Sequence, residues 1–254
     1  MTLEEAAARL RAAGCVFAEE EARLIAEAAG DDPRAHESLV RRRISGEPLE
    51  VVVGWAWFAG LRIPIAPGVF VPRRRTELVA RLATSLTPPG GRVVDLCCGA
   101  GAIAAAVAHA RPDLAVTAAD VDPAAVVLAS RTLAPLGASC LVSDMDGALP
   151  DLAGRVDTVT ACPPYVPTAQ IALMPREARD HEPRLALDGG PDGAALQRAV
   201  LAASARLLRA GGVAIIETSE ALAALTLAAA AAAGFAADVE HDEELGAVAV
   251  IARR

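Results

Sequence analysis

From Thr76 onward, strand-like runs alternate with helix-like runs, and this alternation restricts the fold more than any other feature of the chain. Strands that alternate with helices are typical of a parallel, doubly wound α/β sheet. Because no helix separates the last two strands, we expect them to form a terminal antiparallel hairpin at one edge. The expected strands cover residues 92–95, 115–119, 138–142, 158–161, 212–217, 236–240 and 247–252. The expected helices cover residues 76–86, 103–110, 123–133, 194–208 and 221–233.

The first third of the chain has a different pattern. Apolar residues recur there at helical spacing in three runs, at residues 3–13, 17–29 and 34–44. Between residues 46 and 72, β-branched and aromatic residues interrupted by glycine and proline predict a short hairpin. We therefore expect a small helical N-terminal domain (residues 1–50), a β-hairpin and linker (51–75) and the α/β domain (76–254).

Composition excludes several classes of function. The formal net charge is −8 and all 24 basic residues are arginine, so lysine-based covalent catalysis is excluded and general nucleic-acid binding is disfavoured. The five cysteines include no Cys-x-x-Cys pair, which argues against a disulfide framework and against a zinc or other metal site. The N-terminus is acidic and no apolar run has the length of a membrane span, so we expect a cytoplasmic protein with no membrane contact.

The first expected strand of the α/β domain runs into a glycine-rich turn, residues 97–101. In such sheets, ligands bind beyond the carboxyl ends of the strands, where the strand order reverses. Asp95 closes the strand, and Gly99 and Gly101 let the backbone turn and approach a ligand. A simple tight turn and an NAD site are alternatives, although the third glycine of the dinucleotide fingerprint is missing.

Acidic residues also follow the next two expected strands. Asp120 ends the second strand, and a carboxylate there suits the two hydroxyls of a ribose. Asp144 follows the third strand, where it could accept a hydrogen bond from an adenine amine while Met145 packs on the ring. These positions favour a nucleotide-like cofactor, although Asp144 alone fits a solvated loop equally well.

The turn resembles that of the class I S-adenosylmethionine methyltransferases, which have a Rossmann-like fold. Residues 162–165 read Cys-Pro-Pro-Tyr and stand where amino-methyltransferases of this class carry an Asn/Asp-Pro-Pro-Tyr tetrad. Taken in order, the segments of the chain resemble the HemK/PrmC family, which methylates the glutamine amide of peptide chain release factors. The matching segments are residues 42–48, 54–60, 71–77, 95–103 and 181–190.

This resemblance implies S-adenosyl-L-methionine as the cofactor and a release factor as the protein substrate, recognised by the N-terminal domain. The implied cofactor-binding residues are Asp95, Cys97, Gly99, Gly101, Asp120, Val121, Asp144 and Met145. The implied catalytic residues are Cys162, Pro163, Pro164 and Tyr165. The implied substrate-binding residues are Phe70, Arg73, Glu182 and Pro183. The resemblance implies no metal and leaves the oligomeric state open.

Cys162 is the important departure from the family pattern. An amide nitrogen is a weak nucleophile, so the family holds it by hydrogen bonds to the Asn oxygen and to a proline carbonyl, with the Tyr ring packed on the amide plane. The sulfur of Cys162 is a weak acceptor, and the chain contains no asparagine that could replace it. Losing this acceptor costs about 1–3 kcal/mol, or about ten- to hundredfold in rate.

The sequence leaves four alternative functions open. Cys162 could be a nucleophile, but this requires a lowered thiol pKa, and only His181 is a plausible neighbour. A small-molecule N- or O-methyltransferase would keep the cofactor strands and change Cys162 and the expected loop of residues 168–188. A nucleic-acid amino-methyltransferase should show a basic face that this acidic chain lacks. A non-catalytic binding module would keep the fold without turnover.

Overall fold

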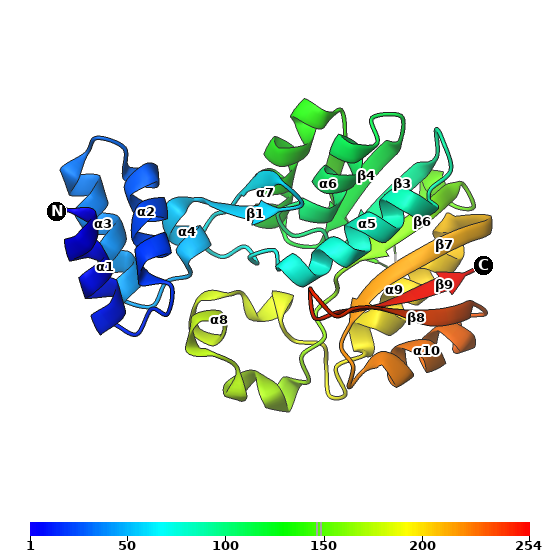
Figure 1. Cartoon of the computed structure of the whole chain (residues 1–254). Helices are drawn as coiled ribbons and strands as arrows, with labels where there is room; N and C mark the ends of the chain where they lie inside the picture. Colours follow the sequence, from blue (N-terminus) through cyan, green and yellow to red (C-terminus); the bar gives the residue numbers. More distant parts are fainter. Residues whose placement is uncertain (146, 148) are drawn as a thin grey trace.

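The computed structural model describes residues 1–145, 147 and 149–254. A cluster of helices at the N-terminus is followed by a two-stranded hairpin and then by a seven-stranded mixed sheet covered by helices on both faces (Figure 1).

The N-terminal helices form a small core of their own. They are α1 (Leu3–Ala12), α2 (Ala18–Ala29), α3 (Pro33–Ile44) and α4 (Leu49–Val53). Thr2 and Glu5 form a capping box that starts α1, and the Asp32 side chain accepts a hydrogen bond that starts α3. Leu10 and Ile25 are fully buried where these helices meet.

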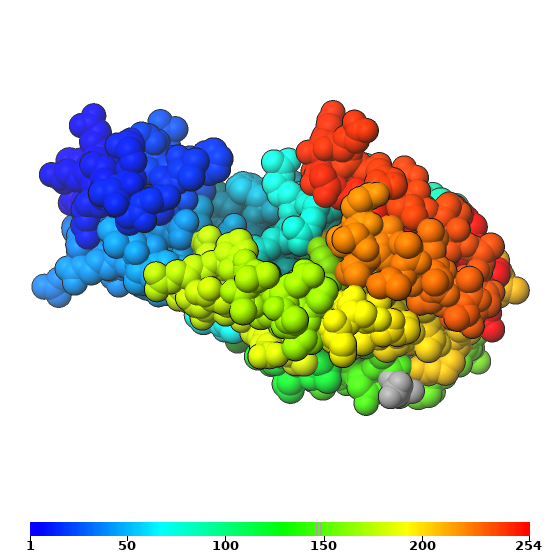
Figure 2. All heavy atoms as spheres, turned by 90° about the horizontal axis from the view of Figure 1, so that it is seen from below, coloured from blue at the N-terminus to red at the C-terminus, as the bar shows by residue number. Residues whose placement is uncertain are grey.

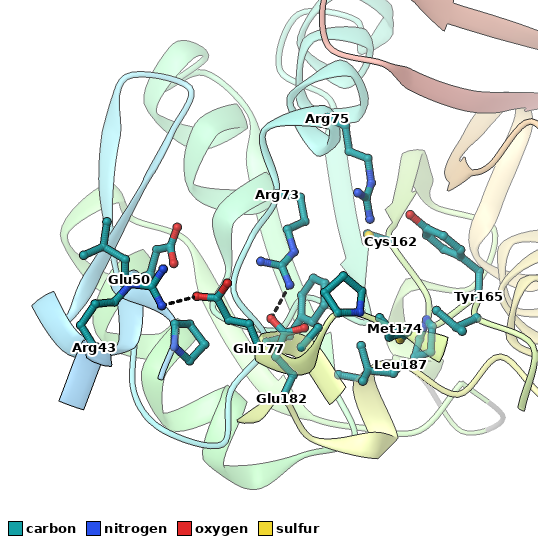
Figure 3. Close-up of a pocket in the computed structure, with 18 of the residues that line it drawn as sticks. Arg43, Glu50, Arg73, Arg75, Cys162, Tyr165, Met174, Glu177, Glu182 and Leu187 are labelled. Atoms are coloured by element: carbon teal, nitrogen blue, oxygen red, sulfur yellow. Dashed lines mark hydrogen bonds and ion pairs between the residues drawn. The ribbon is translucent and has the colours of Figure 1, made fainter. Parts of the chain in front are cut away.

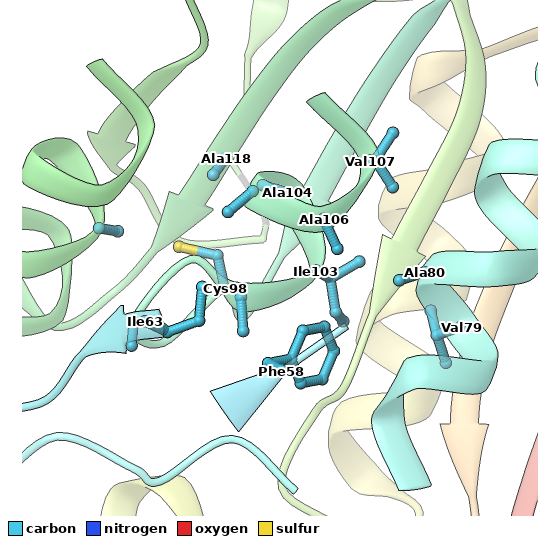
Figure 4. Packing of buried hydrophobic residues seen from close by; sticks show 14 of the residues in the cluster. Phe58, Ile63, Val79, Ala80, Cys98, Ile103, Ala104, Ala106, Val107 and Ala118 are labelled. Atoms are coloured by element: carbon cyan, nitrogen blue, oxygen red, sulfur yellow. The ribbon is translucent and has the colours of Figure 1, made fainter. Parts of the chain in front are cut away.

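Helix α4 was not predicted, because the sequence from residue 46 to residue 72 indicated only a hairpin. Its five residues follow Pro48 and end at Gly54, whose φ of 86° lies in the left-handed region. The hairpin itself is present, as β1 (Trp55–Phe58) and β2 (Leu61–Pro64). Phe58 and Ile63 insert into the core of the α/β domain beside Cys98 and Ile103, so the hairpin packs on that domain (Figure 4).

The large sheet has the strand order β5-β4-β3-β6-β7-β9-β8. Its first five strands are parallel, and β9 lies antiparallel between β7 and β8, which confirms the predicted doubly wound sheet with a terminal hairpin. The strands are β3 (Arg92–Leu96), β4 (Ala115–Asp120), β5 (Ser139–Val142), β6 (Val156–Ala161), β7 (Leu208–Thr218), β8 (Ala236–Asp242) and β9 (Ala247–Arg253).

Helices cover the two faces of this sheet. On one face lie α5, α6 and α7, and on the other lie α9 and α10 (Figure 1). Successive residues of a strand point to opposite faces, so Val93 and Ile215 enter the first core whereas Val94 and Ile216 enter the second. The helices are α5 (Glu77–Leu86), α6 (Ala102–Ala110), α7 (Pro123–Leu133), α8 (Arg176–His181), α9 (Ala195–Leu207) and α10 (Ala223–Ala232). Short 3-10 turns are η1 (Arg74–Thr76), η2 (Ala134–Leu136), η3 (Pro150–Leu152), η4 (Thr168–Leu173) and η5 (Arg184–Ala186).

The strand order reverses at β3, which pairs with β4 on one side and with β6 on the other. At its carboxyl end, Asp95 is fully buried. Its carboxylate accepts hydrogen bonds from the Thr160 hydroxyl on β6 (2.8 Å) and from the backbone N–H of Ala104 in α6 (3.3 Å). One buried side chain thus joins the first turn of α6 to the neighbouring strand.

None of the helices in the described part of the chain has the length and apolar character needed to cross a membrane.

The Asp95 carboxyl should make stability depend on pH. Burial raises the pKa of Asp95 from 3.8 to about 7. The folded protein therefore keeps this proton at pH values where the unfolded chain has lost it, and stability falls as pH rises from 3.8 to about 7 and then levels off. Relative to Asp95→Asn, which cannot titrate there, the wild type should lose up to about 1.4 kcal/mol per pH unit in this window.

Urea unfolding of the wild type and of Asp95→Asn across the pH range measures this difference. The other carboxyl groups titrate in both proteins and cancel. A free-energy difference that stays constant with pH would show that Asp95 is not held protonated in the folded chain.

Candidate functional site

Two cavities open at the carboxyl ends of the parallel strands. The turn cavity, of about 290 Å³, is bordered by the turn after β3 and by the ends of β4 and β5. The tetrad cavity, of about 570 Å³, lies between residues 162–166, the segment 70–75, helices α2 and α4, and α8. The surface is hollowed between the N-terminal helices and the remainder of the chain (Figure 2). Phe70, Cys162, Pro164 and Ala186 line both cavities, so these residues form their shared wall.

Asp120 is an acidic residue that lines the turn cavity. The carboxylate of Asp120 accepts hydrogen bonds from the backbone N–H groups of Gly99 (2.8 Å) and Asp122 (2.9 Å), which fixes the turn against the end of β4. Gly99 has a φ of 54°, and a Cβ built there would meet no atom within 4 Å. The backbone is therefore open to the cavity at this point, as close approach of a ligand requires.

The structure brings together six of the eight expected cofactor-binding residues. Cys97, Gly99, Asp120, Val121, Asp144 and Met145 line the turn cavity. Asp95 and Gly101, the other two expected cofactor-binding residues, are not among the residues that line this cavity. Asp95 is buried behind the turn. Gly101 has a φ of 80° at the start of α6, and a Cβ there would lie 3.1 Å from Ala129 of α7. Both residues therefore shape the turn and do not line its cavity.

All four residues of the expected catalytic tetrad line the tetrad cavity. They follow β6 directly, which presents Cys162 at the carboxyl end of the strand that neighbours β3. Burial raises the pKa of the Cys162 thiol well above its usual value, and the nearby Glu217 carboxylate raises it further. A nucleophilic cysteine needs the opposite shift, and His181 lines neither cavity. The geometry therefore disfavours a nucleophilic Cys162.

Two residues that we did not predict, Glu217 and Arg75, stabilise the position of the Tyr165 side chain. Its hydroxyl donates to Oε1 of Glu217 (3.0 Å), and Nε of Arg75 donates to the same oxygen (3.1 Å). Glu217 is only 1% exposed near the end of β7, and burial raises the pKa of Tyr165. Glu217 could have been found, because it ends a predicted strand as Asp95 and Asp120 do. Arg75 belongs to the short basic run of residues 73–75, and this run alone does not indicate which of its arginines lies in the site.

The expected substrate-binding residues divide between the cavities. Phe70 belongs to the shared wall, Arg73 and Glu182 line the tetrad cavity, and Pro183 lines the turn cavity. Nη2 of Arg73 donates to Oε1 of Glu182 (2.6 Å; Figure 3). The Arg73 guanidinium lies 5.0 Å from the Phe70 ring centre.

The segment after the tetrad folds back onto it. Residues 168–188 were expected as a loop, but they form η4, α8 and η5. The backbone N–H of Val166 donates to Leu187, and that of Gly189 donates to Val166. A Cβ on Gly189 would lie 2.6 Å from Cα of Tyr165, so only glycine permits this approach. This explains the first glycine of the pair, Gly189; at the second, Gly190, the φ of 87° and the nearby Ala195 favour glycine.

Known proteins resemble this chain over much of its length. Residues 60–178 match the methyltransferase small domain family. A release factor glutamine methyltransferase of Mycolicibacterium smegmatis is 40% identical over 222 residues, which cover 84% of this chain and 78% of that protein. A 4-amino-L-phenylalanine/4-methylamino-L-phenylalanine methyltransferase of Streptomyces pristinaespiralis is 39% identical over 196 residues, which cover 74% of this chain and 67% of that protein.

A solved structure supports the fold alone. A methyltransferase from Pyrococcus furiosus matches 76% of this chain and 89% of its own length, with a TM-score of 0.55 and 19% identity. The fold and the resemblance predicted from the sequence are both confirmed. This chain has the class I methyltransferase fold, and with relatives at this identity and coverage it is a methyltransferase that belongs to the release factor glutamine methyltransferase (HemK/PrmC) family.

Proposed function

We propose that the protein transfers a methyl group from S-adenosylmethionine to a nitrogen atom, and that this nitrogen is the side-chain amide of a glutamine in a peptide chain release factor. The observation that carries the proposal is the shared wall of the two cavities. A donor in the turn cavity and an acceptor in the tetrad cavity would meet at Cys162 and Pro164. Such enforced proximity is the main source of rate when the acceptor cannot be deprotonated usefully.

The residues of the turn cavity fit this cofactor. Each carboxylate oxygen of Asp120 accepts one backbone N–H and retains capacity for a ribose hydroxyl. The open backbone at Gly99 would admit the amino-acid part of the cofactor, and Met145 would pack on its base. When bound, the cofactor supplies an electrophilic methyl group on a sulfonium sulfur.

The chain itself orients the acceptor. The Pro163 carbonyl would accept one N–H of the amide, and the ring of Tyr165 would pack on the amide plane. Glu217 accepts the Tyr165 hydroxyl proton in a hydrogen bond, which fixes the ring position. Burial raises the pKa values of both Cys162 and Tyr165, so both side chains stay protonated at neutral pH and neither acts as a base. Catalysis would thus rest on alignment.

The N-terminal helices would hold the protein substrate. Phe17, which immediately precedes α2, Leu24 of α2 and Leu49 of α4 line the tetrad cavity and do not line the turn cavity. We therefore propose that residues 1 to about 50 recognise the release factor and do not contact the cofactor. A release-factor substrate implies a cytoplasmic enzyme.

A second candidate acceptor is a small-molecule amine. Two observations favour it: the tetrad has Cys162 in place of Asn, and a relative that is 39% identical is named for two aromatic amino acids that carry an amine. An amine has a free lone pair when it is neutral, so it depends less on the missing amide acceptor than a glutamine does.

The cofactor proposal predicts a binding defect. Asp120→Ala should weaken the binding of S-adenosylmethionine by about ten- to hundredfold, because it removes an acceptor for the ribose and releases the Gly99 amide. Calorimetry measures the dissociation constants. Asp113→Ala is the matched control, since that aspartate is an exposed residue before β4 that lines neither cavity. Equal affinity in the wild type and Asp120→Ala, or binding of NAD instead, would contradict the assignment.

The acceptor proposal predicts a gain of function. Cys162→Asn should raise methylation of a release-factor glutamine by about ten- to hundredfold, because it restores an acceptor at the aligned amide nitrogen. The new amide would also bring a donor close to Oγ1 of Thr76 and Oε2 of Glu217, two buried oxygens that have no partner among the described residues. Methyl transfer by the wild type and by Cys162→Asn measures the effect.

Tyr165→Ala serves as the control for this comparison. It should abolish transfer in both backgrounds, since the ring that packs on the amide is lost. If Cys162→Asn leaves wild-type activity on glutamine unchanged, residue 162 does not touch the amide. If it leaves glutamine methylation undetectable and impairs transfer to 4-amino-L-phenylalanine, the site serves the second candidate.

A further inference from the structure

The end of the tetrad cavity that lies away from Cys162 is rich in carboxylates. We name this group, formed by Glu50 of α4, Glu177 of α8 and Glu182, the carboxylate end. Figure 3 shows these three side chains on the opposite side of the cavity from Cys162 and Tyr165. Glu20 and Glu21 of α2 also line the tetrad cavity, and Arg43 joins Glu21 to Glu177. Residues from three segments, far apart in the sequence, thus place acidic groups around one space.

Arginines compensate only part of this charge. Arg43 pairs with Glu21 (2.7 Å) and Glu177 (3.0 Å), and Arg73 pairs with Glu182 (2.6 Å). Glu20 and Glu50 make no ion pair within the described part of the chain. Five carboxylates therefore face two guanidinium groups, and Arg75 is paired with Glu217 at the other end of the cavity. A cleft with excess charge of one sign attracts a group of the opposite sign.

One carboxylate oxygen in the cavity wall is buried without a partner. Glu182 is 7% exposed, and its Oε1 accepts from Arg73 and from the backbone N–H of Val71. Its Oε2 has no hydrogen-bond partner among the described residues. A buried acceptor that stays unpaired lowers stability, so a hydrogen-bond donor at this place would be favoured.

The pKa values of Glu177 and Glu182 also indicate a shortage of positive charge at the carboxylate end. Burial raises the pKa values of Glu177 and Glu182, and the neighbouring Glu50 raises both further despite the opposing arginines. A cation placed among these side chains would lower all of these pKa values and would supply N–H donors to them.

We propose that the carboxylate end is a subsite for a cationic group of the methyl acceptor, an ammonium or a guanidinium, bound while the reacting nitrogen lies at Cys162 and Tyr165. The inference rests on the proposed function, since it takes the tetrad cavity as the acceptor site. Two acceptors carry this chemistry: a peptide with a basic side chain close to its glutamine, and a free amino acid with an α-ammonium group.

Two matched pairs of compounds distinguish these sources. The first pair consists of two glutamine-containing peptides that differ only in one residue flanking the glutamine, which is lysine in one peptide and norleucine in the other. Each flanking position is tested in turn. The other is 4-amino-L-phenylalanine and its analogue that lacks the α-ammonium group. Calorimetry on the full chain measures binding independently of turnover. We expect the cationic member of one pair to bind about tenfold more tightly, a typical effect of a partly desolvated charge pair, and that pair identifies the source.

Charge variants locate the effect within the protein. Glu50→Gln removes the carboxylate that has no ion pair and should reduce the preference for the cationic compound about three- to tenfold. Glu4→Gln, on the exposed face of α1, removes the same charge outside the cavity and should keep the preference. Glu182→Gln gives a second test of the same kind if Glu50→Gln does not fold.

The outcomes separate this inference from the proposed function. Equal binding within both pairs, binding of none of the compounds, or equal effects of Glu50→Gln and Glu4→Gln would overturn the subsite. Methylation of the lysine and norleucine peptides at equal rates, together with equal binding within both pairs, would support the proposed function while overturning the subsite. A preference for the cationic amino acid without any methylation of glutamine would support the subsite and overturn glutamine as the acceptor.

Discussion

The hydrogen bond from Thr160 to the buried carboxylate of Asp95 connects the parts of the molecule on which the site depends. Asp95 ends β3, where the strand order reverses, and Thr160 lies two residues before Cys162 on β6. The same carboxylate accepts the N–H of Ala104 in the first turn of α6. The glycine-rich turn and the tetrad are thereby fixed relative to each other. Because the proposed mechanism relies on alignment, this fixed relation would matter more than the reactivity of any single side chain.

Two residues of the tetrad, Cys162 and Tyr165, differ in how well they suit the proposed role. Cys162 offers only a poor acceptor, whereas the Tyr165 hydroxyl is held by a buried carboxylate that also receives Arg75. Gly189 lies against the backbone of the same tyrosine. The ring of Tyr165 is thus held in place although the first residue of the tetrad departs from the family pattern. We therefore expect either a slower amide methyltransferase or a site adapted to an amine.

The α/β architecture could be predicted because each strand of the sheet has a distinct apolar run and each large helix a distinct apolar stripe. Helix α4 could not, since five residues show no periodicity that separates a helix from a strand. The site was only partly predictable for a different reason. Sequence placed Asp95 and Gly101 at the turn, but it could not show that the Asp95 side chain lies buried behind the turn or that Gly101 lies against Ala129 of α7. The contact between Arg75 and Glu217 joins residues 142 positions apart, so no local pattern reveals it.

The central claim is that an acceptor nitrogen meets the methyl donor at Cys162 and that this nitrogen belongs to a glutamine. The most direct measurement is mass spectrometry of a peptide chain release factor after incubation with this protein and S-adenosylmethionine. The account predicts the added mass of one methyl group on a single glutamine side chain, absent when the protein is omitted. An unmodified release factor, under conditions where the protein releases S-adenosylhomocysteine with another acceptor, would contradict it.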